Sequence, residues 1–134
     1  MKPKIRHIAL ITLDPDRLAK FYEDVFEMKR LPRRPGTTSK AVYMTDGYIT
    51  LALLENKAEG KPPGINHFGF HVGSQEEMAE RLDKAGVSRP AKRPADRPYA
   101  ETRATDPDGN NFDLSVAGFE DAPEPPKAKQ PAKV

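Results

Sequence analysis

The sequence predicts an α+β fold built from two copies of a βαβββ module, each with one sheet face left free to line a cleft. The main observation is a repeat, because Ile5–Leu10 (IRHIAL) aligns with Ile65–Phe70 (INHFGF) at an offset of 60 residues. Each run reads as a strand and precedes a helix with a clear start signal. The same order of elements then follows in both halves. Recurrence of a whole supersecondary unit is typical of a duplicated architecture.

The first element is a strand over residues 4–12, with apolar side chains on both faces, as expected inside a layered domain. Asp14 and Pro15 mark a helix start, because aspartate at the N-cap accepts backbone N–H groups and proline suits the first helical position. The inward face of this helix is predicted to carry Leu18, Phe21, Tyr22 and Val25. Three strands follow, predicted over residues 28–31, 40–45 and 48–54, with a loop at 32–38 and an Asp46-Gly47 turn.

The second copy begins with the strand that contains Ile65–Phe70 and continues into a second helix. Ser74 and Glu77 form a capping box, and Gly86 is the expected C-cap. The inward residues of this helix are predicted to be Met78, Ala79, Leu82 and Ala85. The closing hairpin aligns Asp46-Gly47 before Ile49-Thr50-Leu51 with Asp108-Gly109 before Phe112-Asp113-Leu114, with one residue inserted.

Length and composition set the domain boundaries. We expect a single domain over residues 1–119, with module one at 1–56 and module two at 63–119. Residues 120–134 contain four prolines and three lysines, which predicts a disordered tail. The chain has no cysteine, so nitrogen and oxygen atoms must hold any metal.

Charge and hydropathy indicate which partners the chain has. The net charge of +2 comes from 22 basic and 20 acidic residues spread along the sequence, which argues against nucleic acid or an anionic membrane as partner. No apolar run reaches the roughly 18 residues of a membrane span. The basic start lacks the pattern of a secretion signal, so a cytoplasmic location is expected.

Strand alternation places the histidines. In the first strand His7 points away from Ile8 and Leu10, and in the repeat His67 and His71 point away from the apolar phenylalanines, so all three histidines lie on the cleft side. Asp113 follows the same alternation in the last strand. Two histidines and one carboxylate suit a divalent ion such as Fe(II), Mn, Ni or Zn and leave coordination positions open. We therefore predict a metal site at His7, His67 and Asp113.

Other readings of these residues stay open. A single histidine on a strand is more often hydrogen-bonded than metal-bound, and it is the equivalent placement in two copies that favours ligation. His71 is a candidate catalytic group, but it could also support a ligand or lie on the surface. Tyr99 and Arg103 are further catalytic or substrate-contacting candidates. Alternatively, Tyr99 packs in its loop and Arg103 pairs with Glu101 or with solvent.

Together these runs resemble the vicinal oxygen chelate (VOC) superfamily, which includes glyoxalase I, methylmalonyl-CoA epimerase, extradiol dioxygenases and bleomycin-resistance proteins. The resemblance covers about residues 4–117 and rests on both repeat strands, the Leu18–Phe26 helix and the ending from Asp106 to Leu114. It implies an open barrel or cleft, a small-molecule substrate, a divalent metal and a homodimer. It leaves open whether one chain or two close the cleft.

The resemblance matches His7, His67 and Asp113 to metal-ligand positions of the family, and Thr50 to a fourth. Threonine stands where glyoxalase-like and epimerase-like members have a carboxylate, and a hydroxyl cannot abstract a carbon-bound proton unaided. The remaining three-residue pattern is more similar to extradiol dioxygenases, although Arg103 stands where they have tyrosine. We expect ring-cleavage chemistry first, and a lyase or isomerase second. A metal-free binding or drug-sequestering protein of the bleomycin-resistance type is the third reading.

Overall fold

Eight strands and two helices make up the computed structural model, which describes residues 1–33, 39–56, 62–94 and 101–119. The elements are β1 (Lys4–Thr12), α1 (Pro15–Phe26), β2 (Lys29–Arg30), β3 (Val42–Thr45), β4 (Thr50–Glu55), β5 (Gly64–His71), α2 (Gln75–Lys84), β6 (Ala91–Lys92), β7 (Thr102–Thr105) and β8 (Asn111–Ser115). The predicted disordered tail lies outside the described residues.

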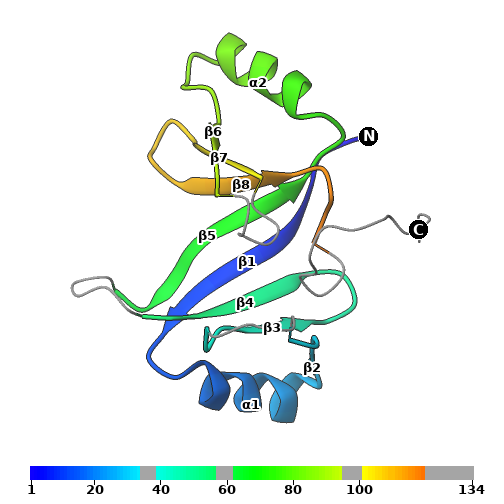
Figure 1. Cartoon of the computed structure of the whole chain (residues 1–134), viewed down its shortest axis with the longest axis vertical. Helices are drawn as coiled ribbons and strands as arrows, with labels where there is room; N and C mark the ends of the chain where they lie inside the picture. Colours follow the sequence, from blue (N-terminus) through cyan, green and yellow to red (C-terminus); the bar gives the residue numbers. More distant parts are fainter. Residues whose placement is uncertain (34–38, 57–61, 95–100, 120–134) are drawn as a thin grey trace.

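The strands form one sheet in the order β2-β3-β4-β1-β5-β8-β7-β6. The two long strands β1 and β5 are antiparallel neighbours at the centre, and each is parallel to the last strand of its own half. Figure 1 shows α1 and α2 at opposite ends of the molecule, one beside each half of the sheet. The α+β class and the repeated order of elements are therefore confirmed.

The first helix starts as predicted but presents a different face to the sheet. The Asp14 side chain accepts a hydrogen bond from the Arg17 backbone N–H at 3.1 Å, as expected of an N-cap. Ala19 is fully buried, whereas Phe21 and Val25 are 49% and 54% exposed. Ala19 has only a methyl group, so the helix lies close to the sheet there, and a residue two positions on is turned about 200° away. The predicted inward positions of Phe21 and Val25 were wrong.

The second helix is capped by Ser74, whose hydroxyl accepts from the Glu77 backbone N–H at 3.1 Å. Its C-cap is Ala85 rather than the predicted Gly86, which follows in a left-handed conformation (φ 84°). Ala85 is exposed and not inward, because the helix ends before it and it forms the C-cap. The predicted inward positions of Met78 and Leu82 are confirmed, since both pack on the buried cluster of Val72, Ala104, Phe112 and Leu114.

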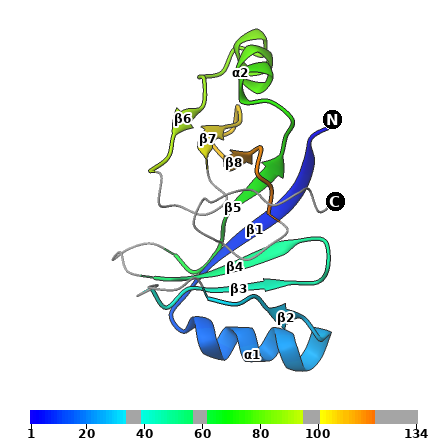
Figure 2. The ribbon, with the colours of Figure 1, turned by 45° about the vertical axis from the view of Figure 1, so that its right-hand side comes forward.

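The strand alternation predicted from the sequence is confirmed at the centre of the sheet. Ile8 and Leu10 pack in the core beside α1, and Phe68 and Phe70 pack in the core beside α2. By alternation the intervening side chains of β1 and β5 lie on the opposite face, and Figure 2 shows the two strands themselves in the middle of the molecule, between the two halves. The candidate ligands therefore share a face that neither helix covers.

The last hairpin of each module, β3–β4 in module one and β7–β8 in module two, corresponds to the other at different residues from those that the sequence alignment paired. Asp113 is opposite Gly69 on β5 and Arg103 on β7, whereas the corresponding position on β4, opposite Ala9 and Tyr43, is Ala52. The counterpart of Asp113 is therefore Ala52, and not Thr50.

The physical reason for this correction lies in the turns. The Asp46 carboxylate accepts from the N–H groups of Tyr48 and Ile49, and the Asp106 carboxylate accepts from those of Asp108 and Asn110. Asp106 thus plays the part of Asp46, so the two Asp-Gly pairs occupy different places in turns of unequal length. The alignment of Asp46 with Asp108 was wrong.

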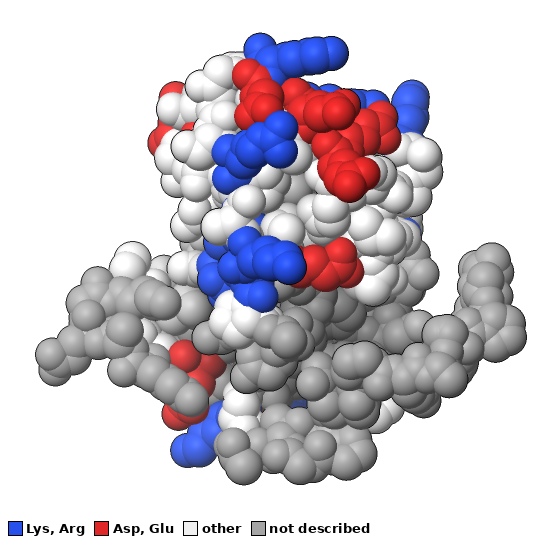
Figure 3. Space-filling view, turned by 45° about the horizontal axis from the view of Figure 1, so that its top comes forward, with Lys and Arg blue, Asp and Glu red and all other residues white. Residues whose placement is uncertain are grey.

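No helix in the described ranges combines the length and the apolar character needed to cross a bilayer. On the face drawn in Figure 3, basic and acidic side chains lie beside one another. That distribution agrees with a nearly balanced charge along the sequence.

Candidate metal centre

Three side chains from β1, β5 and β8 converge at the seam between the two halves. His7, His67 and Asp113 each offer a ligand atom, and these atoms lie within 4.8 Å of one another. All three residues are buried, with 4%, 7% and 1% of their surface exposed. Two atoms bound to one ion at about 2.2 Å can be at most about 4.4 Å apart, so the three side chains would draw closer together on an ion. The nitrogen and oxygen donors suit a divalent ion.

Asn66 orients the His67 ring so that its other nitrogen lies in the cluster. The Nδ1 of His67 lies 2.7 Å from the Asn66 side-chain oxygen, and its Nε2 lies 3.1 Å from Asp113 Oδ2. Nε2 is therefore the nitrogen that could bind an ion. A histidine that binds a metal through one ring nitrogen typically has its other ring nitrogen hydrogen-bonded, as Nδ1 is here to Asn66.

His7 is neutral in this environment. Burial, together with the nearby His67 and Arg103, lowers the pKa of His7 to about 4, although Asp113 acts in the opposite direction. Its Nε2 lies 3.9 Å from Asp113 Oδ2. At neutral pH the imidazole is therefore uncharged, the form in which histidine binds metal ions.

Arg103 is the fourth member of the cluster. Its Nε donates to Asp113 Oδ1 at 2.6 Å, and its Nη2 lies 3.1 Å from His67 Nε2. Burial raises the pKa of the Asp113 carboxyl, but its contacts with His67 and Arg103 lower it below the usual range. The alternative that Arg103 pairs with Glu101 or only with solvent was wrong, because the hairpin register puts it opposite Asp113.

Phe119 closes the site from the chain that follows β8, and sequence reasoning missed it. Its ring is fully buried and stacks on His7, with centroids 4.9 Å apart and planes 5° from parallel. The Thr50 hydroxyl donates to the Phe119 carbonyl oxygen. A Cβ at Gly69 would lie 2.9 Å from the ring, so the glycine makes room for it. The available signal was its place as the last large apolar residue before the Pro/Lys-rich segment.

Glu101 holds the segment that carries Phe119, and it too was not predicted as a functional residue. Its carboxylate accepts hydrogen bonds from the Ser115 hydroxyl and from the backbone N–H groups of Val116 and Ala117, at 2.8–2.9 Å. The Gln75 side chain at the start of α2 donates to the same carboxylate. Burial raises the pKa of Glu101, but these hydrogen bonds outweigh it and the net pKa is lowered.

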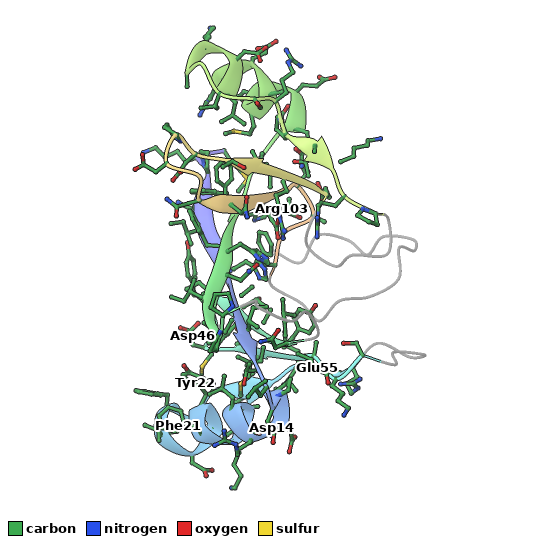
Figure 4. The ribbon with its side chains drawn as sticks, turned by 90° about the vertical axis from the view of Figure 1, so that its left-hand side faces the viewer. Asp14, Phe21, Tyr22, Asp46, Glu55 and Arg103 are labelled. Carbon is green, nitrogen blue, oxygen red and sulfur yellow. The ribbon has the colours of Figure 1, made fainter. Side chains whose placement is uncertain are left out.

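The remaining candidates lie elsewhere. His71 is four residues along β5 from His67, about 13 Å at the usual rise, and its Nε2 is 3.0 Å from the Val116 carbonyl oxygen. Tyr99 lies outside the described residues. Glu55 ends β4, and its Oε2 lies 4.0 Å from Lys40 Nζ. Figure 4 shows Glu55 well apart from Arg103. The structure thus joins Arg103, and not His71, to the predicted metal ligands.

Comparison with known proteins agrees with this fold. Residues 4–114 match the model of a family described as the Glyoxalase/Bleomycin resistance protein/Dioxygenase superfamily. An uncharacterized protein of Pseudomonas aeruginosa is 32% identical, over 86% of this chain and 89% of the relative. A probable trivalent organoarsenical cleaving enzyme of Bacillus subtilis is 28% identical, over 83% of this chain and 78% of that protein.

A solved structure supports the same architecture. Methylmalonyl-CoA epimerase from Mycobacterium tuberculosis superposes with a TM-score of 0.62, over 92% of this chain and 88% of that one, at 19% identity. At this level of identity the likeness concerns the fold alone. It agrees with the resemblance inferred from the repeated strands.

Proposed function

Because this chain belongs to the Glyoxalase/Bleomycin resistance protein/Dioxygenase superfamily, we propose that it is a metal-dependent enzyme acting on a small oxygenated substrate. His7, His67 and Asp113 would hold one divalent ion, of the Fe(II), Mn, Ni or Zn type. The observation that carries the proposal is the convergence of their ligand atoms within 4.8 Å on a buried face. All three come from one chain, so this trio needs no second copy. A homodimer remains a prediction.

The residues around the trio have separate tasks in this proposal. Asn66 orients the His67 ring, and burial keeps His7 neutral. Arg103 donates a hydrogen bond to Oδ1 of Asp113, and the Phe119 ring keeps water from one face of His7. When bound, the ion supplies a Lewis acid that polarises two adjacent oxygens of the substrate. The protein contributes the buried, pre-arranged surroundings in which such polarisation is strong.

Oxygenative cleavage of a catechol-like diol is the reaction we propose first. Both atoms of O₂ would enter the ring-opened product, so no outside reductant is needed. An epimerase or glyoxalase reaction needs a group that removes a carbon-bound proton, and here the Thr50 hydroxyl is engaged by the Phe119 carbonyl while Glu55 lies beside Lys40. Lyase or isomerase chemistry is therefore the weaker form of the proposal.

The residues of this chain do not favour the activity named for the Bacillus subtilis relative. A trivalent arsenic centre is soft and prefers thiolate ligands, and these 134 residues contain no cysteine. A substrate that binds through oxygen fits the donor set better.

A second candidate function is metal-free binding of a small molecule, as the bleomycin-resistance part of the family name suggests. One observation favours it. Arg103 already contacts both His67 and Asp113, so the charges of the site balance without an ion. In that case the cluster would be a binding surface with a fixed arginine.

Metal content separates the two candidates. We would purify the wild type, His7→Ala, Asp113→Ala and His71→Ala without chelator and measure bound metal by mass spectrometry. His71→Ala is the matched control, because it removes a histidine from the same face outside the trio. We expect stoichiometric metal in the wild type and the control and little in the other two. Near-zero metal in all four would favour the metal-free binder.

Oxygen consumption then tests the reaction itself. The metal-loaded wild type should consume one O₂ per catechol cleaved, and His71→Ala should do the same. A metal-bound protein that consumes no O₂ with any catechol would exclude the dioxygenase form and leave the lyase or isomerase form.

A further inference from the structure

We propose that the Arg103 guanidinium is an internal cation that competes with the divalent ion for His67, so that Arg103 sets the metal affinity of the site. The inference rests on the proposed metal site and concerns its regulation. In this view the metal-free site is closed by a residue of the chain, and loading requires Arg103 to release His67.

The contacts of one nitrogen atom carry the argument. An ion would bind His67 through the lone pair of Nε2, because the other ring nitrogen, Nδ1, is bonded to the Asn66 side chain. Arg103 Nη2 lies 3.1 Å from that Nε2, at hydrogen-bonding distance. A lone pair donated to a metal is not available to an N–H group. Arginine and metal therefore exclude one another at His67.

Electrostatics act in the same direction. The guanidinium group carries a positive charge. It lies among buried groups, since the Arg103 side chain is 22% exposed and that of Asp113 is 2% exposed. A divalent ion bound to His67 would be within a few ångströms of this positive charge, and repulsion is strong where water screens little. Removing the charge should therefore favour the ion.

The geometry also allows Arg103 to leave His67 without leaving the site. Its Nε binds Asp113 Oδ1, whereas the histidines face Oδ2. The carboxylate can thus keep Arg103 on one oxygen and present the other to an ion. Only the side chain has to turn, because Arg103 and Asp113 remain opposite one another in the β7–β8 ladder.

Zn²⁺ and Mn²⁺ titrations of chelator-treated protein test the proposal by calorimetry. We would compare the wild type with Arg103→Ala and Arg103→Gln, which remove the charge, and with Arg103→Lys, which keeps it. Lys92→Ala is the control, because it removes an exposed cation from the neighbouring strand β6. We expect the two neutral variants to bind at least about tenfold tighter. Arg103→Lys and Lys92→Ala should stay within about threefold of the wild type.

Thermal unfolding gives an independent readout. Without metal, Arg103→Gln should melt below the wild type, because Asp113 loses its partner. With saturating Zn²⁺ the variant should gain more in melting temperature than the wild type does. If Arg103→Ala does not fold, Arg103→Gln provides the same comparison.

The possible failures are distinguishable. If the wild type binds metal and the neutral variants bind equally or more weakly, the inference is wrong and the proposed function stands. An equal gain in Lys92→Ala would also overturn it, because the effect would then be general to any cation. If no protein in the series binds either metal, the proposed metal site itself fails.

Discussion

The two halves of the molecule share a backbone plan but not a chemistry. At the positions where module two has Asp113 and Arg103, module one has Ala52 and Tyr43. Glu101, which accepts several hydrogen bonds in module two, falls at the position of Ala41 in module one at the repeat offset of 60. Module one contributes His7 to the cluster, and module two supplies both charges. The two modules therefore share the arrangement of their strands and sheet faces, whereas the charged and hydrogen-bonded residues of the site belong to module two.

The largest effect is expected from removing the ring of Phe119. This residue lies at the end of module two and stacks on His7 of module one. We expect Phe119→Ala to lower the free energy of unfolding by about 3–5 kcal/mol, because a fully buried ring leaves a cavity. Phe21→Ala, on the exposed side of α1, should cost less than about 1 kcal/mol. Urea denaturation of both variants measures the difference. Similar small costs would mean that Phe119 does not join the halves.

Gly69 sharpens the comparison, because its counterpart in module one is Ala9. Gly69→Ala should destabilise the protein by about 1–3 kcal/mol, since the added methyl group meets the Phe119 ring at 2.9 Å. In a Phe119→Ala background the same substitution should cost much less. A double-mutant cycle from urea denaturation tests this coupling. Equal costs in both backgrounds would locate the strain elsewhere.

Glu101 tests the hydrogen-bonded end of module two. Glu101→Gln should cost about 1–2 kcal/mol at pH 7, because an amide replaces one of two accepting oxygens. The folded-state pKa of Glu101 is lowered, so its contribution is complete above the unfolded-state pKa of about 4.3 and is lost as the pH falls through the folded value.

Stability measured from pH 7 to pH 3 provides the check for Glu101. The wild type and Glu101→Gln should converge at the acid end of this range. A difference that stays constant with pH would show that the carboxylate charge is not what holds residues 115–117.

The smallest expected effects concern the turns and test the corrected alignment of the modules. Asp46→Ala and Asp106→Ala should each lower the melting temperature, because each carboxylate accepts two backbone N–H groups of its turn. Asp108→Ala should change it little. Differential scanning calorimetry is the measurement. If Asp108→Ala were the damaging change, the original alignment of the Asp-Gly pairs would be restored.

Much of the fold was predictable because strand alternation and helix capping act locally. The spacing of His7 and His67 within matching strands placed both on the face opposite the helices, and Asp14 and Ser74 marked the helix starts. The face of α1 was misjudged because Phe21 and Val25 have the right spacing, yet the small Ala19 decides which side approaches the sheet.

The rest of the site depends on contacts between distant segments. The partner of Arg103 follows from the hairpin register, which a one-residue difference in turn length changes without altering the apolar pattern. The position of Phe119 follows from a chain reversal after β8, fixed by hydrogen bonds to Glu101 and Thr50. Neither feature has a periodic signal in the sequence, so neither could be read from it.

The antiparallel pairing of β1 and β5 at the centre of the sheet also sets the distance between the two histidines of the cluster. His7 is opposite Gly69 and His67 is opposite Ala9, so the two imidazoles are diagonal neighbours with ring centroids 5.4 Å apart. A slip of two residues between β1 and β5 would keep both rings on the same face but shift them by about 7 Å. The register of the backbone hydrogen bonds between β1 and β5 therefore determines the spacing of the two imidazoles.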